Sequence, residues 1–268
     1  MEKYVIRGGR IGYDRLQVLA RARWPDTSAL LDRIGVRPGM HCLDVGCGGG
    51  AVTLELARLV APDGEAIGID MDEITLQLAR EASAAEGLPN VEFEVADVEE
   101  WTEDATYDLV YCRFLLHHLS DPLGLLQKMW AAVRPGCVIA VEDADMDGRF
   151  CDPPNDGFEL WRRAYPELLR RRGGDATIGR KLHRYFLDIG IPAPQLTVAQ
   201  DVRTAGEAKM MPLLTLEATA DAILSEGIAS ETELNTAIAD LASFTDDAGT
   251  TIAGPRVLQV WSRRPNEH

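Results

Sequence analysis

Short apolar runs and helix-like segments alternate along residues 34–144. The apolar runs, which predict β-strands, fall at 41–45, 66–69, 91–95, 107–111 and 137–141. Segments with apolar residues three or four positions apart, which predict amphipathic helices, fall at 52–60, 73–86 and 122–133. This alternation predicts right-handed βαβ units and a parallel sheet. Because the strands are apolar almost throughout, we expect helices on both faces of the sheet.

The region before the first strand, residues 1–33, predicts a helical flap. The apolar spacing predicts one helix over 13–23 and a second over 26–34. Pro25 marks the start of the second helix and Gly35 its end.

After residue 143 two helical insertions interrupt the alternation. The elements expected in this part are helices at 156–172, 178–187, 205–226 and 230–244, and strands at 194–199 and 256–263. If 194–199 runs parallel to the earlier strands and 256–263 runs antiparallel, both insertions leave from the carboxyl edge of the sheet. Open α/β sheets bind ligands at that edge, so the insertions predict a lid over a ligand site.

The chain therefore divides into six predicted segments. They are an N-terminal helical flap (1–33), a ligand-binding core (34–144), a lid insertion (145–177), a core continuation (178–200), a second helical lid insertion (201–254), and the last core strand with a tail (255–268).

A glycine-rich turn follows the first strand. Residues 46–51 read Gly-Cys-Gly-Gly-Gly-Ala, and the helix predicted at 52–60 starts directly after them. Gly46, Gly48 and Gly50 have no Cβ, so backbone N–H groups can approach a ligand at the positive end of a helix. The run also matches the dinucleotide pattern G-x-G-x-x-G/A, so a nicotinamide-dependent oxidoreductase is one alternative.

Three acidic residues lie at or just after the ends of the first three strands and bear on whether the ligand carries a pyrophosphate. Asp44, at the end of the first strand, would repel a pyrophosphate but suits an ammonium group. Asp70, at the end of the second strand, suits two ribose hydroxyls in either interpretation. Asp97, after the third strand, suits an exocyclic adenine amine, with Val98 beside the ring. Together they predict an adenosine without phosphates that carries a positively charged tail.

These motifs resemble those of the class I S-adenosylmethionine-dependent methyltransferases, in the branch of ubiquinone-biosynthesis-type and small-molecule enzymes. The similar stretches are the glycine-rich motif at 43–50, the ribose-binding acid at 68–71, the adenine-binding acid at 96–98, the fourth-strand motif at 107–122 and the helix and turn at 126–136. The resemblance implies a Rossmann-like α/β fold with seven mostly parallel strands, an antiparallel last strand, and S-adenosyl-L-methionine as co-substrate.

The candidate cofactor-binding residues follow from the motifs and the resemblance. They are Asp44, Gly46, Gly48, Gly50, Asp70, Met71, Asp97, Val98, Arg113, Arg15 and Tyr4. Arg113 follows the fourth strand, within reach of the methionine moiety or of an acid in the lid. Arg15 and Tyr4 are placed to close the flap on the methionine carboxylate, with simple helix packing as the alternative.

The implied reaction is an in-line displacement at an already activated methyl group. Alignment of the reactants and exclusion of water are the main requirements, and only a weakly acidic acceptor such as a hydroxyl needs a base. The candidates for that base are His117, Asp143 and His183. The acids at 142, 143, 145 and 147 offer oxygen ligands for Mg²⁺. We expect no metal there, with one acid shaping the pocket and the others solvated.

Charge and composition limit which binding partners and which cellular compartment we expect. The formal net charge of −16 argues against a nucleic-acid or anionic-membrane partner. No apolar run reaches the ~18 residues of a membrane span, and the first residues hold no apolar signal-peptide core. The 5 cysteines are odd in number and lack metal-like spacing, which fits free thiols in a reducing compartment.

We therefore expect a cytoplasmic methyltransferase, monomeric or homodimeric, that acts on a small-molecule acceptor such as a metabolite or a natural product. The alternatives are a Rossmann-type NAD(P)-dependent oxidoreductase and a non-catalytic partner protein that keeps a nucleotide-binding fold. The intact glycines and acids argue against the non-catalytic alternative, because scaffolding alone does not need them.

Overall fold

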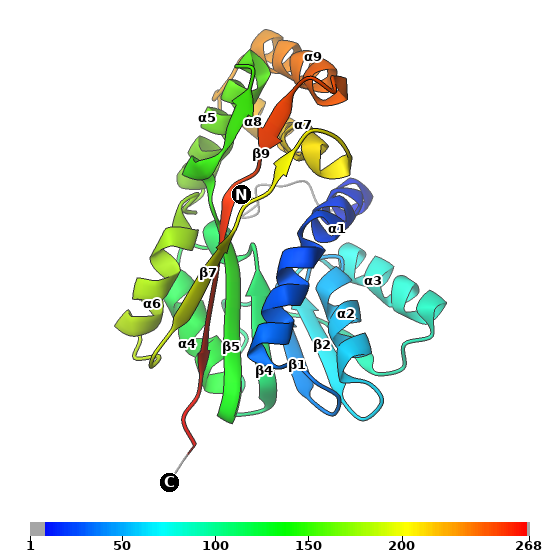
Figure 1. Cartoon of the computed structure of the whole chain (residues 1–268), viewed down its shortest axis with the longest axis vertical. Helices are drawn as coiled ribbons and strands as arrows, with labels where there is room; N and C mark the ends of the chain where they lie inside the picture. Colours follow the sequence, from blue (N-terminus) through cyan, green and yellow to red (C-terminus); the bar gives the residue numbers. More distant parts are fainter. Residues whose placement is uncertain (1–8, 267–268) are drawn as a thin grey trace.

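The protein is built on a 7-stranded sheet (Figure 1). The computed structural model describes residues 9–266, and the side chains from residue 12 onward. The strand order is β3-β2-β1-β4-β5-β10-β7, and β10 is antiparallel to both of its neighbours. The strands are β1 (His41–Val45), β2 (Glu65–Asp70), β3 (Val91–Val95), β4 (Tyr107–Arg113), β5 (Val133–Asp145), β7 (Gln195–Ala199) and β10 (Arg256–Arg263). This topology confirms the predicted Rossmann-like sheet with an antiparallel last strand.

Two groups of helices cover the two faces of the sheet (Figure 1). They are α1 (Gly9–Ile34), α2 (Ala51–Val60) and α3 (Glu73–Glu86) on one face, and α4 (Pro122–Ala132) and α6 (Leu182–Asp188) on the other. Leu30 and Leu56 are fully buried in the first layer, and Leu126 and Phe186 in the second. Because both faces are covered in this way, the central strands read as continuous apolar runs.

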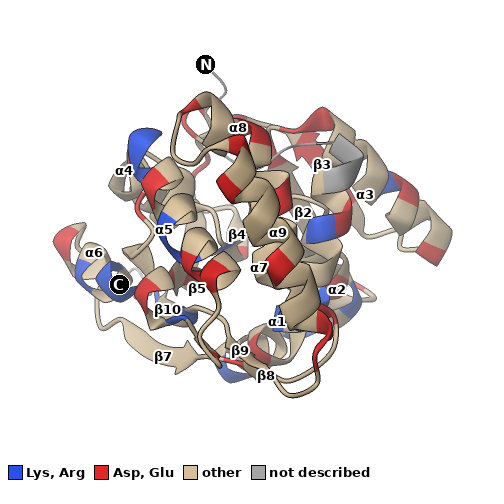
Figure 2. Ribbon diagram, turned by 90° about the horizontal axis from the view of Figure 1, so that it is seen from above, with Lys and Arg blue, Asp and Glu red and all other residues tan. Residues whose placement is uncertain are grey.

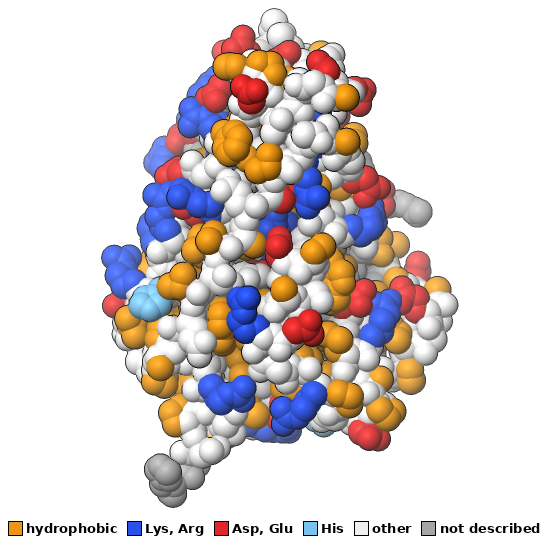
Figure 3. Space-filling model, in the orientation of Figure 1, with side chains coloured by type: hydrophobic (Ala, Val, Ile, Leu, Met, Phe, Trp, Pro, Cys, Tyr) orange, Lys and Arg blue, Asp and Glu red, His pale blue; other side chains and the backbone are white. Residues whose placement is uncertain are grey.

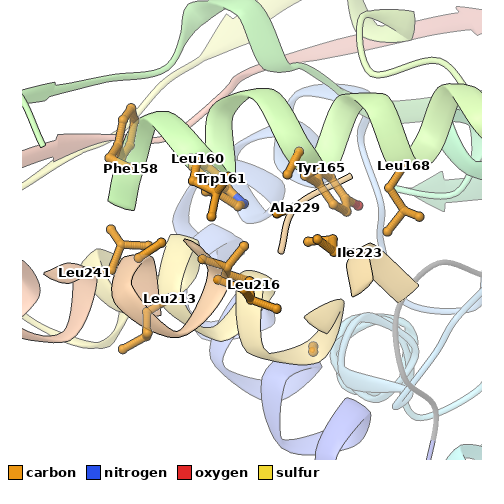
Figure 4. Close-up of a cluster of buried hydrophobic side chains, with 14 of the residues drawn as sticks. Phe158, Leu160, Trp161, Tyr165, Leu168, Leu213, Leu216, Ile223, Ala229 and Leu241 are labelled. Carbon is orange, nitrogen blue, oxygen red and sulfur yellow. The ribbon is translucent and has the colours of Figure 1, made fainter. Parts of the chain in front are cut away.

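A third group of elements stands above the carboxyl edge of the sheet, and we call it the upper layer (Figure 1). It consists of α5 (Asp156–Arg171), α7 (Met211–Ala218), α8 (Ala220–Ser225), α9 (Glu231–Asp246) and a small sheet formed by β6 (Phe150–Asp152), β9 (Thr251–Ala253) and β8 (Val202–Arg203). A separate apolar cluster joins α5 to α7 and α9 through Phe158, Leu216 and Leu241 (Figure 4). The upper layer therefore has a hydrophobic core of its own.

The N-terminal segment forms one helix, α1, where two were predicted. Pro25 lies inside this helix and not at the start of a second one. A proline in a helix interior removes one backbone hydrogen bond. Two ion pairs on the neighbouring turn help to offset that loss, because the Arg23 guanidinium lies 2.6 Å from Asp26 and 2.6 Å from Asp201. Asp201 is far away in the sequence, so the local pattern could not predict this support.

The fifth strand is longer than predicted. It was expected at 137–141, but β5 continues to Asp145. Glu142 and Asp143, which were expected in a mostly solvated run after the strand, therefore lie within it and are 1% and 0% exposed. Burial of acids is tolerated where other groups bond to them, and each of these acids has such partners, described below.

Two predicted helices are subdivided, and the small sheet was not predicted. The region 205–226 forms a 3₁₀ turn (Glu207–Met210) followed by α7 and α8, while 178–187 starts with a 3₁₀ turn (Ile178–Lys181) before α6. Pro212 lies in the first turn of α7, where proline favours a helix start. The strands of the small sheet have 2 or 3 residues each, which is too short for a periodic pattern.

Charges of both signs are spread over the surface. Seen from above, acidic residues lie on α7, α8 and α9 (Figure 2). In the view of Figure 3, basic side chains are interspersed with acidic and apolar ones. No helix within residues 9–266 combines the length and the apolar character that a membrane span requires.

Candidate functional site

A cavity of about 620 Å³ lies between the carboxyl edge of the sheet and the upper layer. Its lining residues come from the turns that follow β1, β2, β3 and β4, and from α1, α5 and α7. Ligand-binding pockets in proteins commonly have volumes of ~300–1,000 Å³. The cavity is therefore large enough for a ligand, and it lies where open α/β sheets place their binding sites.

The glycine turn after β1 has a conformation that requires glycine. The φ angles of Gly46, Gly48 and Gly50 are +68°, +52° and +70°, a region that residues with a Cβ rarely adopt. A Cβ on Gly50 would lie 2.6 Å from Phe93, and one on Gly48 would lie 3.0 Å from Leu16. Gly46 and Gly48 line the cavity, whereas Gly50 is the N-cap of α2 behind it. The turn thus brings bare backbone to the cavity wall.

Asp44 lines the same cavity from the end of β1 and is 3% exposed. Its Oδ2 accepts a hydrogen bond of 2.7 Å from the hydroxyl of Thr53 on α2. Burial raises the pKa of Asp44 to about 6, although Thr53 and the nearby Arg113 act in the opposite direction. A cationic group bound beside Asp44 would favour its ionised form. Thr53 could not be predicted as part of the site, because it occupies an ordinary position in the helical pattern.

Asp70 lies at the end of β2, beside the glycine turn. Its Oδ2 accepts a hydrogen bond of 2.8 Å from the Gly48 N–H, and its Oδ1 accepts one of 3.0 Å from the Asp72 N–H. Burial raises the pKa of Asp70, against the lowering effect of these backbone bonds. A carboxylate offers about four acceptor sites, so Asp70 can still accept bonds from two ligand hydroxyls. Met71, which follows it, also lines the cavity and is 56% exposed.

Asp97 and Val98 line the cavity from the turn after β3. The Oδ1 of Asp97 accepts a hydrogen bond of 2.9 Å from the Glu99 N–H, which fixes the turn. The structure therefore brings Asp44, Asp70 and Asp97, from three neighbouring strands, to one cavity together with the glycine turn.

Two of the arginines that line the cavity, Arg15 and Arg113, are predicted cofactor-binding residues, and both contact other elements. Arg113, at the end of β4, donates a hydrogen bond of 3.0 Å to the hydroxyl of Thr27 on α1. Arg15, on α1, donates one of 3.0 Å to the hydroxyl of Thr215 on α7 and is 9% exposed. Its buried Nε has no hydrogen-bond partner among the described residues. Tyr4, the remaining candidate for this end of the site, lies outside the described residues.

A buried acid–imidazole pair forms the wall below α5. His117 Nδ1 lies 2.7 Å from Asp143 Oδ1, and the His117 N–H donates a bond of 3.2 Å to Oδ2. His117 Nε2 lies 3.4 Å from the hydroxyl of Tyr165. His117 and Tyr165 line the cavity, while Asp143 lies behind them and is fully buried. Burial raises the pKa of Tyr165 to about 12, so this hydroxyl stays protonated at neutral pH.

The other two histidines near this region differ from His117. His118 lines the cavity with its ring centroid 3.9 Å from that of His117. Burial, with smaller effects of His117 and Arg15, lowers the pKa of His118 well below its usual range. His183 lies on α6 and is not a lining residue of the cavity. Of the three predicted base candidates, the structure brings together His117 and Asp143 and leaves His183 apart.

The remaining acids of β5 are engaged in contacts within the fold. Glu142 accepts hydrogen bonds from Thr27 (2.8 Å), Tyr111 (2.5 Å) and Gln259 (2.8 Å). Asp145 pairs with Arg180 and Arg256. Within residues 9–266 there is no group of three or more His, Cys, Asp or Glu side chains suited to a metal ion. Glu142 therefore ties α1 to the sheet, a role that its sequence neighbours do not indicate.

The profile of a methyltransferase domain family matches residues 37–183. An uncharacterised 37.1 kDa protein in transposon TN4556 of Streptomyces fradiae is 32% identical over 186 residues, which are 67% of this chain and 52% of that protein. The ubiquinone biosynthesis O-methyltransferase of Acinetobacter baumannii (strain ACICU) is 34% identical over 118 residues, 43% of this chain and 46% of that protein. The chain thus spans about half the length of the curated relatives it matches.

A solved structure shows a similar chain fold. The SAM-dependent methyltransferase from Aquifex aeolicus is 25% identical, has a TM-score of 0.51, and the match covers 64% of this chain and 82% of that one. The range matched by the family profile contains the glycine turn and the three cavity-lining acids that the sequence resemblance singled out.

Proposed function

Because the chain belongs to the methyltransferase domain family, we propose that it transfers a methyl group from S-adenosyl-L-methionine to a small-molecule acceptor, a metabolite or a natural product. One observation carries this proposal. The glycine turn and the acids Asp44, Asp70 and Asp97 line a single cavity, and together they suit a phosphate-free adenosine with a cationic tail.

Each lining group has a part in holding such a molecule. Asp44 would face the methionine ammonium, because a buried carboxylate of raised pKa gains most from a bound cation. Asp70 would accept bonds from the ribose hydroxyls next to Met71. Asp97 would accept a bond from the adenine amine, with Val98 against the ring. The unpartnered Nε of the buried Arg15, together with Arg113, suits the methionine carboxylate.

The bound co-substrate supplies a methyl group already activated on a sulfonium. What the chain must add is alignment of the acceptor and exclusion of water. The upper layer and α1 enclose the cavity, and Arg15 joins them through its bond to Thr215. The part of the cavity under α5 and α7, beyond the three acids, is left for an acceptor of small-molecule size. The name of the relative from Acinetobacter baumannii, a ubiquinone biosynthesis enzyme, agrees with an acceptor of this kind.

Calorimetry with S-adenosylmethionine, S-adenosylhomocysteine and NADH tests the first half of the proposal. We expect both adenosyl ligands to bind and NADH not to bind. Asp70→Asn should weaken binding roughly 10- to 100-fold, as expected when hydrogen bonds to a charged group are lost. Asp63→Asn, on an exposed turn, is the matched control and should bind as the wild type does. Binding of NADH in place of the adenosyl ligands would support the oxidoreductase alternative and overturn the proposal.

Isotopically labelled S-adenosylmethionine tests the second half. Incubation of the protein with a metabolite extract should transfer the label to molecules that pass a small-pore filter, where mass spectrometry identifies them. Label found only in the retained proteins or nucleic acids would contradict a small-molecule acceptor.

A further inference from the structure

The part of the cavity below α5 is lined by apolar and aromatic side chains, and we call it the acceptor half. It includes Phe114, Met146, Trp161 and Tyr165, together with the two adjacent imidazoles of His117 and His118. Figure 4 shows Trp161 and Tyr165 on α5, on the side that faces α7. Phe114 has a φ of +56°, a conformation that costs a non-glycine residue ~1–3 kcal/mol and is retained mainly at functional sites. These walls fit a flat, apolar molecule.

The carboxylates of the cavity lie elsewhere. Those among the described lining residues are Asp44, Asp70, Asp72, Asp97, Glu99 and Asp201. The first five lie at or just after the ends of β1, β2 and β3, on the side of the glycine turn, and Asp201 is paired with Arg23 at 2.6 Å. Within the described lining, no carboxylate is therefore left to hold a cationic group in the acceptor half. This distribution disfavours an amine as the acceptor.

Asp143 fixes the orientation of His117. Both carboxylate oxygens accept backbone hydrogen bonds, since Oδ1 accepts from the Ala144 N–H at 2.7 Å and Oδ2 from the His117 N–H at 3.2 Å. An ionised carboxylate can only accept, so the 2.7 Å contact to the imidazole is donated by Nδ1–H. Nε2 is then the basic nitrogen, and it lies 3.4 Å from the hydroxyl of Tyr165, which lines the cavity as His117 does. This is how a histidine is held when it serves as a base.

We propose that the acceptor is an apolar aromatic molecule methylated on a hydroxyl oxygen, and that His117, held by Asp143, takes the proton of that hydroxyl; this inference rests on the methyl transfer proposed above. The O–H bond breaks and the proton passes to Nε2, while an oxygen electron pair forms the bond to the methyl carbon. The carbon–sulfur bond breaks with its electron pair on sulfur. The positive charge therefore moves from sulfur to the imidazolium, beside the Asp143 carboxylate.

An aromatic hydroxyl matches the strength of this base. A phenol has a pKa of about 10, so its proton can pass to an imidazole as the methyl group is transferred. Aliphatic hydroxyls are far weaker acids. His118 is unsuited to the same task, because burial and the adjacent His117 disfavour a second positive charge. Tyr165 can donate to the acceptor oxygen, since its own hydroxyl stays protonated.

The test compares His117→Asn and Asp143→Asn with His183→Asn, a control outside the cavity. The labelled product from the metabolite extract should carry its new methyl on an aromatic oxygen. With that acceptor, His117→Asn should lower kcat about 100- to 10,000-fold, the range for loss of a general base. Calorimetry should show unchanged affinity of all three variants for S-adenosylhomocysteine. His183→Asn should have wild-type kcat.

Two further measurements separate a base from a structural role. In NMR spectra the hydrogen-bonded Nδ1 proton should disappear in His117→Asn, and its signal should shift in Asp143→Asn, where a charged acceptor is lost. The wild-type kcat should rise with pH, and this limb of the pH profile should vanish in His117→Asn. The titratable groups that face the His117 ring are Asp143 from β5, Tyr165 from α5 and the adjacent His118. Arg15 from α1 lies near His118 and Tyr165.

Three outcomes would overturn this inference. They are a methyl group found on nitrogen, carbon or sulfur, a methyl group on an aliphatic oxygen, and a kcat of His117→Asn within threefold of the wild type. In each case S-adenosylhomocysteine binding by the wild type would leave the proposed function intact. Absence of that binding would instead refute the proposed function itself.

Discussion

The hydroxyl of Thr53 donates a 2.7 Å hydrogen bond to Oδ2 of Asp44, and the two side chains are 0% and 3% exposed. This bond joins the first turn of α2 to the end of β1, across the glycine turn. It favours the ionised carboxylate, but burial has the larger effect and raises the pKa of Asp44 to about 6. Asp44 therefore changes charge close to neutral pH, with consequences for ligand binding and for stability.

Affinity for S-adenosylhomocysteine should depend on pH through Asp44. The ammonium group of the ligand needs the ionised carboxylate, so binding weakens as the pH falls through about 6. For a single group with that pKa, we expect roughly tenfold weaker binding at pH 5 than at pH 7. Calorimetry across this range measures the effect. Asp44→Asn should bind weakly at both pH values, and a wild-type affinity that is flat from pH 7 to pH 5 would refute this role.

The free energy of unfolding should also depend on pH through Asp44, but it should rise as the pH falls. The ordinary pKa of an Asp carboxyl, which applies to the unfolded chain, is 3.8, whereas the pKa of Asp44 in the folded protein is about 6. Between these pH values the folded protein therefore binds a proton that the unfolded chain does not. The stability contributed by Asp44 therefore falls as the pH rises through that window. Relative to Asp44→Asn, the wild type should gain about 1.4 kcal/mol in free energy of unfolding from pH 7.5 to pH 5. Urea denaturation of the unliganded proteins measures this difference, and Asp63→Asn should show no such gain.

Two glycines with similar backbone angles should differ in their tolerance of alanine. Gly50 and Gly190 have φ angles of +70° and +82°. A Cβ on Gly190 would meet nothing within 4 Å, whereas one on Gly50 would lie 2.6 Å from Phe93 and 2.9 Å from Ala79. Gly190→Ala should therefore cost only the backbone strain, ~1–2 kcal/mol. Gly50→Ala should cost a further ~1–3 kcal/mol for overpacking. If urea denaturation shows equal losses of unfolding free energy for the two variants, Phe93 and Ala79 can move aside at little cost, which contradicts this prediction.

The core of the fold and the cofactor end of the site were predictable because the patterns that indicate them lie within short stretches of the sequence. Each of Asp44, Asp70 and Asp97 follows an apolar run, and parallel strands bring their carboxyl ends to one edge. Alternation of strands and helices is visible within a window of about 15 residues. The same window could not show that α1 continues through Pro25, because its partner Asp201 lies far along the chain.

The pairing of His117 with Asp143 also depends on contacts between distant parts of the sequence. In the sheet, Arg113 on β4 lies opposite Glu142 on β5, so the residues just beyond them meet at the same edge. This register could not be read from the apolar runs, since β5 was expected to end before Glu142. For the same reason the sequence could not distinguish His183 from His117 as a candidate base, although only His117 of the two lines the cavity.

The hydrogen bond from Arg15 to Thr215 should hold α1 against the upper layer. Thr215→Val keeps the shape of the side chain but removes the oxygen that Arg15 Nη2 reaches at 3.0 Å. Leaving a buried donor without a partner costs ~1–3 kcal/mol. We therefore expect a lower free energy of unfolding and faster amide hydrogen exchange along α1.

Thr219→Val is the matched control for this prediction. The Thr219 hydroxyl is also buried, but it donates to the Thr215 carbonyl, which already accepts the Thr219 N–H at 3.1 Å. Its loss leaves no group of α1 without a partner, so exchange along α1 should stay at the wild-type rate. If Thr219→Val accelerates that exchange as much as Thr215→Val does, the effect comes from a general weakening of α7. The bond to Arg15 would then not be what keeps α1 closed over the cavity.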